Sequence, residues 1–197
     1  KPILEYSVEL LASHGIDEII LATGYMHEKI RKYFGGGEKF GVKILYSVEQ
    51  EPLGTGGALK EAEHMLDGSF FMLNGDNIAD FNLSAMALEH FSAKADSTIE
   101  LCEFADVSSF GVARLEGKKI TEFVEKPKSG TEPSKLVNEG AYVIEKSALE
   151  FLPAGFNLIE RTLFPQLAKR GTLFGHLHKG MWLTTDTHER LKEAEKA

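Results

Sequence analysis

The feature that most constrains this chain is an apolar run that stops abruptly at a turn carrying a carboxylate. Phe70 to Leu73 are followed directly by Asn74, Gly75 and Asp76. Such a run predicts a buried strand of a parallel sheet, and ligands in open α/β sheets bind beyond the carboxyl ends of the strands. A carboxylate there suits Mg²⁺, which takes one or two protein carboxylates together with phosphates and water. On these residues alone, an ordinary strand-ending turn explains the sequence equally well.

The segments before this run alternate between helical and strand patterns. Apolar residues recur at helical spacing up to His14 and Gly15, which end the first helix. A strand at 17–23, a helix at 28–34, a strand at 42–48 and a helix at 54–66 are expected to follow. This alternation predicts an α/β fold with a Rossmann-like, mostly parallel sheet, right-handed crossovers and helices on both faces.

Strand patterns dominate the second half of the chain, which we expect to form a strand-rich, substrate-binding half of the same fold. The expected elements are a helix at 82–94 capped by Asn82, strands at 97–104, 111–115, 120–125, 141–145 and 172–178, and helices near 147–152, 157–169 and 187–197. No repeat or linker interrupts the sequence, so residues 1–197 are predicted to be a single domain.

Composition argues against several functional classes. The formal charge of −8 and the pI near 5.4 argue against a nucleic-acid partner, which requires a basic surface. No apolar run approaches the roughly 20 residues that span a bilayer, so no membrane partner is expected. The one cysteine, Cys102, excludes an internal disulfide, fits a cytoplasmic location and is expected to be a core residue. His176 and His178 share one face of a strand and, without a third ligand nearby, are expected to be exposed strand residues.

Two further stretches carry residues suited to a phosphate-bearing ligand. The segment 49–58 (EQEPLGTGGA) follows a strand, and its three glycines would let backbone N–H groups approach a nucleobase or phosphate closely. It matches neither a dinucleotide-binding fingerprint nor a Walker A loop. Glu125 and Lys126 end another strand, where a Lys could neutralise a phosphate while a Glu accepts hydrogen bonds from sugar hydroxyls. A solvated ion pair is the alternative for these two residues.

Taken together, these stretches resemble the sugar-1-phosphate nucleotidyltransferase family over essentially the whole chain. The motifs that carry the resemblance are KPILEY (1–6), PLGTGGAL (52–59), LNGD (73–76), FGV (110–112), FVEKP (123–127), NEGAY (138–142) and the late Trp182. The resemblance implies in-line attack by a sugar-1-phosphate oxygen on the α-phosphorus of a nucleoside triphosphate, with Mg²⁺ and release of pyrophosphate. Such chemistry depends on positioning and charge stabilisation. The family also forms homo-oligomers, which the resemblance implies here.

The resemblance assigns roles residue by residue. Asp76 would hold the metal, and Lys126 would bind the phosphate of the sugar phosphate. The nucleotide would be bound by Glu49, Gln50, Gly54, Thr55 and Gly75, and the sugar by Gly111, Glu125, Asn138 and Gly140.

The residue at position 49 bears on the choice of base. Family members that bind uracil or thymine commonly have a Gln where this chain has Glu49. A carboxylate accepts two hydrogen bonds from guanine, whereas thymine and uracil offer one N–H between two carbonyls. Glu49 therefore favours GTP and, by family analogy, mannose-1-phosphate. Gln50 is one residue away, and a shift in the loop would restore a pyrimidine preference.

Two departures from the family pattern bear on catalysis. Family members begin with a Gly-rich loop that holds an Arg and a Lys, and we expect this segment to be missing here. The second metal-binding Asp of the commonest pattern falls on Thr184, a poorer Mg²⁺ ligand. Some relatives carry Asp-Thr four residues after the Trp, which Asp186 and Thr187 match. Asp186 is then either the second metal ligand or a helix N-cap.

The sequence therefore predicts an enzyme that makes a nucleotide sugar, with GTP and mannose-1-phosphate as the favoured substrates. One alternative is a thymidylyl-, uridylyl- or cytidylyltransferase acting on glucose-1-phosphate. Another is a non-catalytic nucleotide-sugar-binding regulatory homologue, which Thr184 and the missing loop favour.

Overall fold

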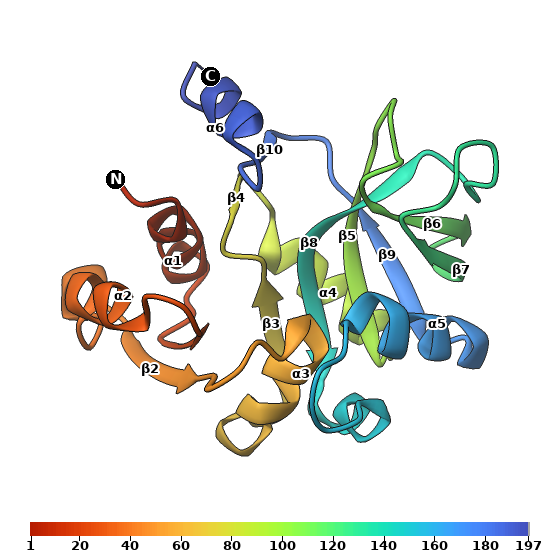
Figure 1. The fold of residues 1–197 in the computed structure, drawn as a ribbon. Coiled ribbons are helices and arrows are strands. Elements are labelled where there is room, and N and C mark those ends of the chain that lie inside the picture. The colour runs from red at the N-terminus through yellow and green to blue at the C-terminus, as the bar shows by residue number, and fades with distance from the viewer. Residues whose placement is uncertain (197) are drawn as a thin grey trace.

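A parallel strand pair and a larger sheet organise the chain in the computed structural model, which describes residues 1–196. Strands β1 (Glu18–Thr23) and β2 (Lys43–Val48) pair in parallel, and α1 (Ile3–Ser13) and α2 (His27–Phe34) pack beside them. The connection from β1 to β2 ends in the short 3-10 turn Glu38–Phe40. This part of the chain forms the left side of the molecule in Figure 1.

The larger sheet has six strands in the order β3-β8-β5-β9-β7-β6. Its strands are β3 (Ser69–Leu73), β5 (Ser97–Glu103), β6 (Gly111–Glu116), β7 (Lys119–Glu125), β8 (Leu136–Glu145) and β9 (Leu173–Leu177). The remaining elements are α3 (Gly54–Glu61), α4 (Leu83–Ala93), α5 (Ile159–Arg170), α6 (His188–Ala194), the strands β4 (Asn77–Ala79) and β10 (Trp182–Thr184), and the 3-10 turns Ala62–Met65 and Lys146–Phe151.

Helices cover both faces of the six-stranded sheet, as expected (Figure 1). Ile99 and Leu101 of β5 belong to the buried core that includes α5, whereas Thr98 contacts His90 of α4. Because side chains alternate along a strand, Glu100 and Cys102 share the α4 side with Thr98. Asn82 caps α4 as predicted, accepting a hydrogen bond from the Ala85 N–H at 3.0 Å.

The α/β class and the strand-rich second half are confirmed, and the strand directions need a correction. Within residues 1–196, only the β1–β2 and β5–β9 pairs are parallel, so the six-stranded sheet is mixed rather than mostly parallel. The run Phe70–Leu73 pairs antiparallel with β8 and makes no ladder with β1. The reason is that β8 is ten residues long and almost wholly buried, so it can pair with β3 at one end and with β6 at the other.

A groove separates β1 from β3. It has a volume of about 920 Å³ and is lined by 19–23 of β1, by 69–73 of β3 and by the inner face of α1. Each residue of β3 is only half-buried, although four of the five are large and apolar. Side-chain packing of α1, β1 and β2 against Phe71, Leu73 and Ala141 joins the two parts of the molecule.

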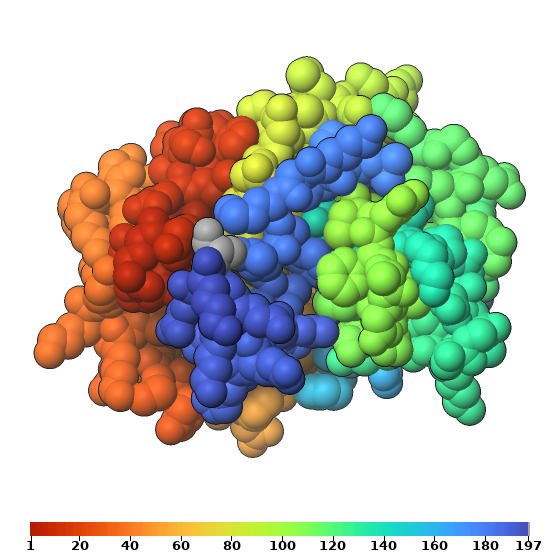
Figure 2. All heavy atoms as spheres, turned by 90° about the horizontal axis from the view of Figure 1, so that it is seen from above, coloured from red at the N-terminus to blue at the C-terminus, as the bar shows by residue number. Residues whose placement is uncertain are grey.

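The C-terminal segment crosses the top of the molecule between the two parts. Strand β10 pairs antiparallel with β4, and α6 follows it. Figure 2 shows this segment, in dark blue, beside the N-terminal residues in red and close to the segment around residues 100–110 in green. Within residues 1–196, every helix is too short or too polar to cross a bilayer.

Candidate active site

The predicted site residues gather in two adjoining cavities that share Asn74. The large groove is lined at one end by Glu49, Gly54, Thr55 and Gly75, all predicted to bind the nucleotide. A smaller cavity of about 140 Å³ is lined by the predicted metal and sugar residues Asp76, Gly111, Glu125, Asn138, Gly140 and Asp186. The structure therefore divides the predicted residues into a nucleotide group and a metal and sugar group.

Two predicted residues line neither cavity. Gln50 and Lys126 are both exposed. Lys126 has a positive φ of 49°, uncommon for a residue with a side chain, and its N–H donates to the Phe110 carbonyl at 3.0 Å. This backbone bond ties the end of β7 to the segment before β6.

Asp76 lies between β3 and β4, at the mouth of the smaller cavity, as predicted. The Thr185 N–H and hydroxyl both donate to the Asp76 carbonyl, at 3.0 and 2.7 Å. Burial raises the pKa of the Asp76 carboxyl, and the nearby charge of Asp186 raises it further. Two carboxylates thus face one small cavity and repel each other.

Asp186 is not a helix N-cap. Thr187 caps α6, because its hydroxyl accepts a hydrogen bond from the Arg190 N–H at 3.2 Å. The Asp186 carboxylate lines the cavity and accepts from Arg190 Nη1 at 2.9 and 3.0 Å. Thr184 lines the same cavity and offers only a neutral hydroxyl.

The stretch Asn138–Gly140 is an irregular part of β8 that is shaped by its own hydrogen bonds. Asn138 Oδ1 accepts from the Gly140 N–H at 2.9 Å, and Asn138 Nδ2 donates to the Tyr142 hydroxyl at 2.9 Å. Gly140 has a φ of +79°, and a Cβ there would lie 2.6 Å from Asn74 Nδ2. Only glycine fits this conformation and this contact without strain.

Gly111 and Glu125 are paired across β6 and β7 and together line the cavity. A Cβ on Gly111 would lie 2.5 Å from Phe123 Cζ and 2.9 Å from Glu125 Oε2. Burial raises the pKa of Glu125, and the charge of Glu160 adds to the effect.

Sequence reasoning missed Glu160, which also lines the smaller cavity. Glu160 lies in the first turn of α5 and accepts a hydrogen bond from Thr55 Oγ1 at 2.7 Å, while the Ile159 N–H donates to the same hydroxyl at 3.0 Å. An acidic residue opening a helix is normally explained by the helix dipole, so its position alone does not mark it. Thr55 therefore links the two cavities.

The glycine-rich turn serves a different purpose from the one predicted. The N–H groups of Gly56 and Gly57 donate to the Asn157 carbonyl at 3.0 and 3.2 Å, so they are not available to a ligand. A Cβ on Gly56 would overlap Asn157 Oδ1. These two glycines allow α3 to pack closely on the segment before α5.

Glu49 is held in place with one oxygen free. Its Oε2 accepts a hydrogen bond from the Leu53 N–H at 2.9 Å, and its side chain lines the large groove. No other hydrogen bond to the carboxylate is formed within residues 1–196. The remaining oxygen can therefore accept a hydrogen bond from a ligand.

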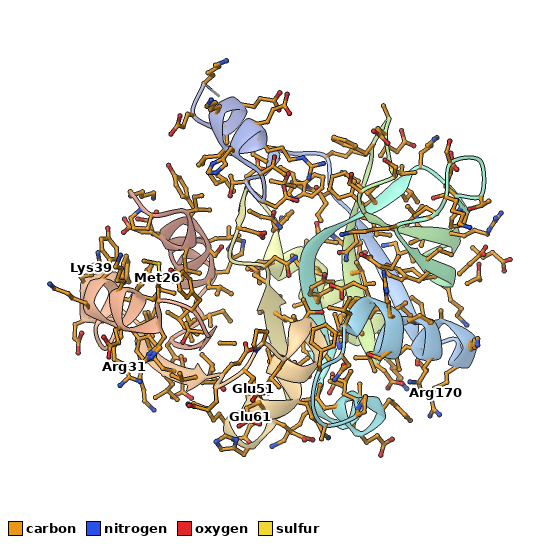
Figure 3. All side chains as sticks on the ribbon, viewed as in Figure 1. Met26, Arg31, Lys39, Glu51, Glu61 and Arg170 are labelled. Atoms are coloured by element: carbon orange, nitrogen blue, oxygen red, sulfur yellow. The ribbon has the colours of Figure 1, made fainter. Side chains whose placement is uncertain are left out.

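The smaller cavity is strongly acidic. Five acidic residues line it, and no Lys or Arg of the described chain does; the five are Asp76, Glu125, Glu139, Glu160 and Asp186. The labelled basic side chains Arg31, Lys39 and Arg170 lie at the outer edges of the molecule (Figure 3). An anionic substrate could not enter this cavity without a cation to offset the carboxylates.

The expectation that His176 and His178 are exposed is wrong. Their side chains are only 12% and 7% exposed, and each contacts a carboxylate that is wholly buried, Glu100 and Glu139 respectively. No group of three or more His, Cys, Asp or Glu side chains suited to a metal occurs within residues 1–196. The periodicity placed both histidines on one face correctly, but it could not show that the α4 side of the sheet carries buried acids.

Comparison with known proteins agrees with this geometry. The family model described as nucleotidyl transferase matches residues 1–197. The chain belongs to the nucleotidyl transferase family. It is 38% identical over 192 residues to a mannose-1-phosphate guanyltransferase of Yarrowia lipolytica, covering 93% of this chain and 52% of that protein.

Two other proteins are also similar to this chain. The D-glycero-alpha-D-manno-heptose 1-phosphate guanylyltransferase of Aneurinibacillus thermoaerophilus is 38% identical over 151 residues, covering 76% of this chain and 64% of that protein. The crystal structure of HddC from Yersinia pseudotuberculosis complexed with GMP-PN has a TM-score of 0.81 and 26% identity, covering all of this chain and 85% of that chain. The chain spans about half the length of the mannose-1-phosphate guanyltransferase that it matches.

Proposed function

We propose that this protein transfers a guanylyl group from GTP to a sugar-1-phosphate, with mannose-1-phosphate as the leading acceptor, and releases pyrophosphate. The names of two relatives at 38% identity support a guanylyl donor and a manno-configured sugar phosphate. The adjoining cavities support it as well, because a nucleotide and a sugar phosphate must meet for an in-line transfer. The single cysteine supports a cytoplasmic location.

The observation that carries the proposal is the acidic lining of the smaller cavity. The carboxylates of Asp76 and Asp186 repel each other there, and a divalent cation would relieve that repulsion. Both are hard oxygen donors of the kind that Mg²⁺ prefers. We therefore assign Mg²⁺ to Asp76 and Asp186, where the ion would offset the charge of the phosphates. Each Asp186 oxygen keeps a second lone pair, so this carboxylate can bind the ion while it still accepts from Arg190.

The sugar and its phosphate are assigned to the residues around this cavity. Glu125 would accept hydrogen bonds from sugar hydroxyls, Asn138 would accept or donate them, and the backbones of Gly111 and Gly140 would line the sugar site beside them. Lys126 would bind the phosphate from outside the cavity, as an exposed point charge. The base would lie at the groove end that Glu49 and Gly54 line.

The proposal is tested by pyrophosphate release from the protein with its natural flanking chain. Mannose- and glucose-1-phosphate are each offered with GTP, dTTP, UTP, ATP and CTP in Mg²⁺. We expect the highest rate with GTP and mannose-1-phosphate, and no release when EDTA removes the metal. If no pair releases pyrophosphate but GDP-mannose binding is still detected by thermal shift, the result would support a non-catalytic nucleotide-sugar binder instead. Size-exclusion chromatography of the same sample tests for a homo-oligomer.

Glu49→Gln should reduce the preference for GTP over dTTP by about 10-fold or more. The substitution keeps an oxygen for the Leu53 N–H but removes the carboxylate that accepts two guanine N–H groups, a loss of about 1.5–3 kcal/mol. The measurement is the ratio of kcat/KM for the two nucleotides. Gln50→Ala is the matched control, since Gln50 is exposed. If the kcat/KM ratio changes in Gln50→Ala and not in Glu49→Gln, Gln50 rather than Glu49 selects the base.

A further inference from the structure

Both ring nitrogens of His178 face carboxylates. Nδ1 lies 3.0 Å from Glu139 Oε1, and Nε2 lies 3.0 Å from Asp80 Oδ1. The imidazole is nearly buried, and the Phe81 ring packs edge-on against it with centroids 5.0 Å apart. Its position directly after β9 is fixed by the His178 N–H, which donates to the Leu101 carbonyl at 2.9 Å.

This geometry requires a doubly protonated ring. A neutral imidazole has one N–H donor and one acceptor nitrogen, and an acceptor nitrogen facing a carboxylate oxygen would be repelled by it. When both carboxyls are ionised, only an imidazolium satisfies both of them. Burial lowers the pKa of His178, but the hydrogen bond and charge of Glu139, together with Asp80 and Glu100, outweigh burial and leave the pKa raised.

Glu139 depends on this imidazolium. Its side chain is wholly buried, and Oε2 has no hydrogen-bond partner within residues 1–196. Burial raises the pKa of Glu139, and the hydrogen bond from His178 opposes that rise. Of the other ionisable groups on this side of the sheet, Glu100 raises the pKa of Glu139 further, the Cys102 thiol lowers it by hydrogen bonding, and His176 pairs with Glu100 instead. His178 is thus the cation that stabilises the Glu139 carboxylate.

The two carboxylates belong to segments that carry the active site. Glu139 lies between Asn138 and Gly140, and its carbonyl accepts from Asn77 Nδ2 at 2.8 Å. Asp80 follows β4, and its Oδ1 also accepts from the Met181 N–H at 2.6 Å, directly before Trp182. The contacts of His178 therefore join three segments: residues 138–140 of β8, strand β4 after Asp76, and the segment that leads to Asp186.

We propose that His178 is a positioning residue whose imidazolium holds Glu139 and Asp80 together and thereby sets the sugar-phosphate cavity. This inference rests on the proposed function for its effect on turnover. Of the three residues in this Glu139–His178–Asp80 cluster, only Glu139 lines the smaller cavity, so His178 and Asp80 act through the segments that they join.

The sign of the pH dependence follows from the raised pKa of His178. The imidazolium and its two bonds are complete below the ordinary histidine pKa of about 6.5 and are lost as the pH rises through the raised value. The KM for mannose-1-phosphate should therefore increase at alkaline pH. The KM for GTP should not follow, because the cluster does not line the large groove.

The test combines an NMR titration of the histidines with kinetics of the protein carrying its natural flanking chain. In the wild type, kcat/KM for mannose-1-phosphate should fall at alkaline pH. The midpoint of this fall, which we call the alkaline limb, should coincide with the NMR pKa of His178. Glu139→Gln should lower both values together, by about one pH unit or more, since it removes the charge that raises the pKa of His178 most. His178→Gln should abolish the limb and raise the KM for mannose-1-phosphate by about 10-fold, with the KM for GTP unchanged.

His176→Gln is the matched control, because His176 lies on the same face of β9 and pairs with the buried Glu100. The His176→Gln variant should be less stable, but the pH of its alkaline limb in kcat/KM should be unchanged. An NMR pKa of His178 at or below about 6.5, or a limb unmoved by Glu139→Gln, would overturn the proposal. If no sugar phosphate supports turnover, the proposed function fails separately. The titration and the pH dependence of GDP-mannose binding by thermal shift then still decide the role of His178.

Discussion

Asp76→Asn should reduce turnover by about 1,000-fold or more, because it removes a charged metal ligand whose ion supplies several kcal/mol of charge stabilisation. The same change should leave the melting temperature equal to or above that of the wild type. The pKa of Asp76 is raised in the folded protein, so its ionised form opposes folding at neutral pH, and an uncharged amide removes that opposition. Loss of activity and retained stability would together identify a functional carboxylate.

The measurements are pyrophosphate release with GTP and mannose-1-phosphate, and thermal unfolding at pH 7. Asp17→Asn is the control, since Asp17 is exposed and lies outside both cavities. An Asp76→Asn protein that keeps more than about a tenth of the wild-type rate would remove Asp76 from the metal site.

Gly140→Ala should destabilise the fold by about 2–5 kcal/mol and abolish turnover. The left-handed backbone, with φ at +79°, costs an alanine about 1–2 kcal/mol. The new Cβ would also lie within 2.6–2.8 Å of the Asn74 and Asn77 side chains, and such overpacking costs about 1–3 kcal/mol more. Both asparagines line the smaller cavity, so relieving the overlap must deform it.

Gly15→Ala separates the two contributions. Gly15 has almost the same backbone, with φ at +80°, and nothing lies within 4 Å of its would-be Cβ. Urea unfolding of both variants should therefore show a cost of about 1–2 kcal/mol for Gly15→Ala and a clearly larger one for Gly140→Ala. If both variants lose the same free energy of unfolding and Gly140→Ala keeps its turnover, the close contact with Asn74 contributes to neither stability nor activity.

Local sequence patterns predicted the helices, strands and turns well, because neighbouring residues specify each of them. The Asn82 cap, the apolar run of β3 and the turn at Asp76 depend on neighbouring residues, and the structure has all three where the sequence placed them. The grouping of Asp76, Asn138 and Gly140 was implied by the family resemblance instead, because Asn138 and Gly140 lie inside β8 and not at a strand end.

Features that depend on distant partners could not be predicted. The antiparallel pairing of β3 with β8 is a choice among strands far apart in the sequence. The three-residue strands β4 and β10 are too short for a periodic pattern and exist only because they pair with each other. The glycines of α3 were assigned to a ligand because the sequence does not reveal that Asn157 packs on them.

The groove between β1 and β3 also bears on how the protein opens. No backbone ladder crosses it in the described chain, so the β1–β2 part and the six-stranded sheet are joined by side-chain packing and by the connecting segment 49–68. Parts joined in this way unfold as separate cooperative units, and amide hydrogens along the facing strand edges should exchange early. The large groove lies between the two parts and the smaller cavity within the larger part, so a bound nucleotide sugar that reaches both cavities would slow this exchange by holding the parts together.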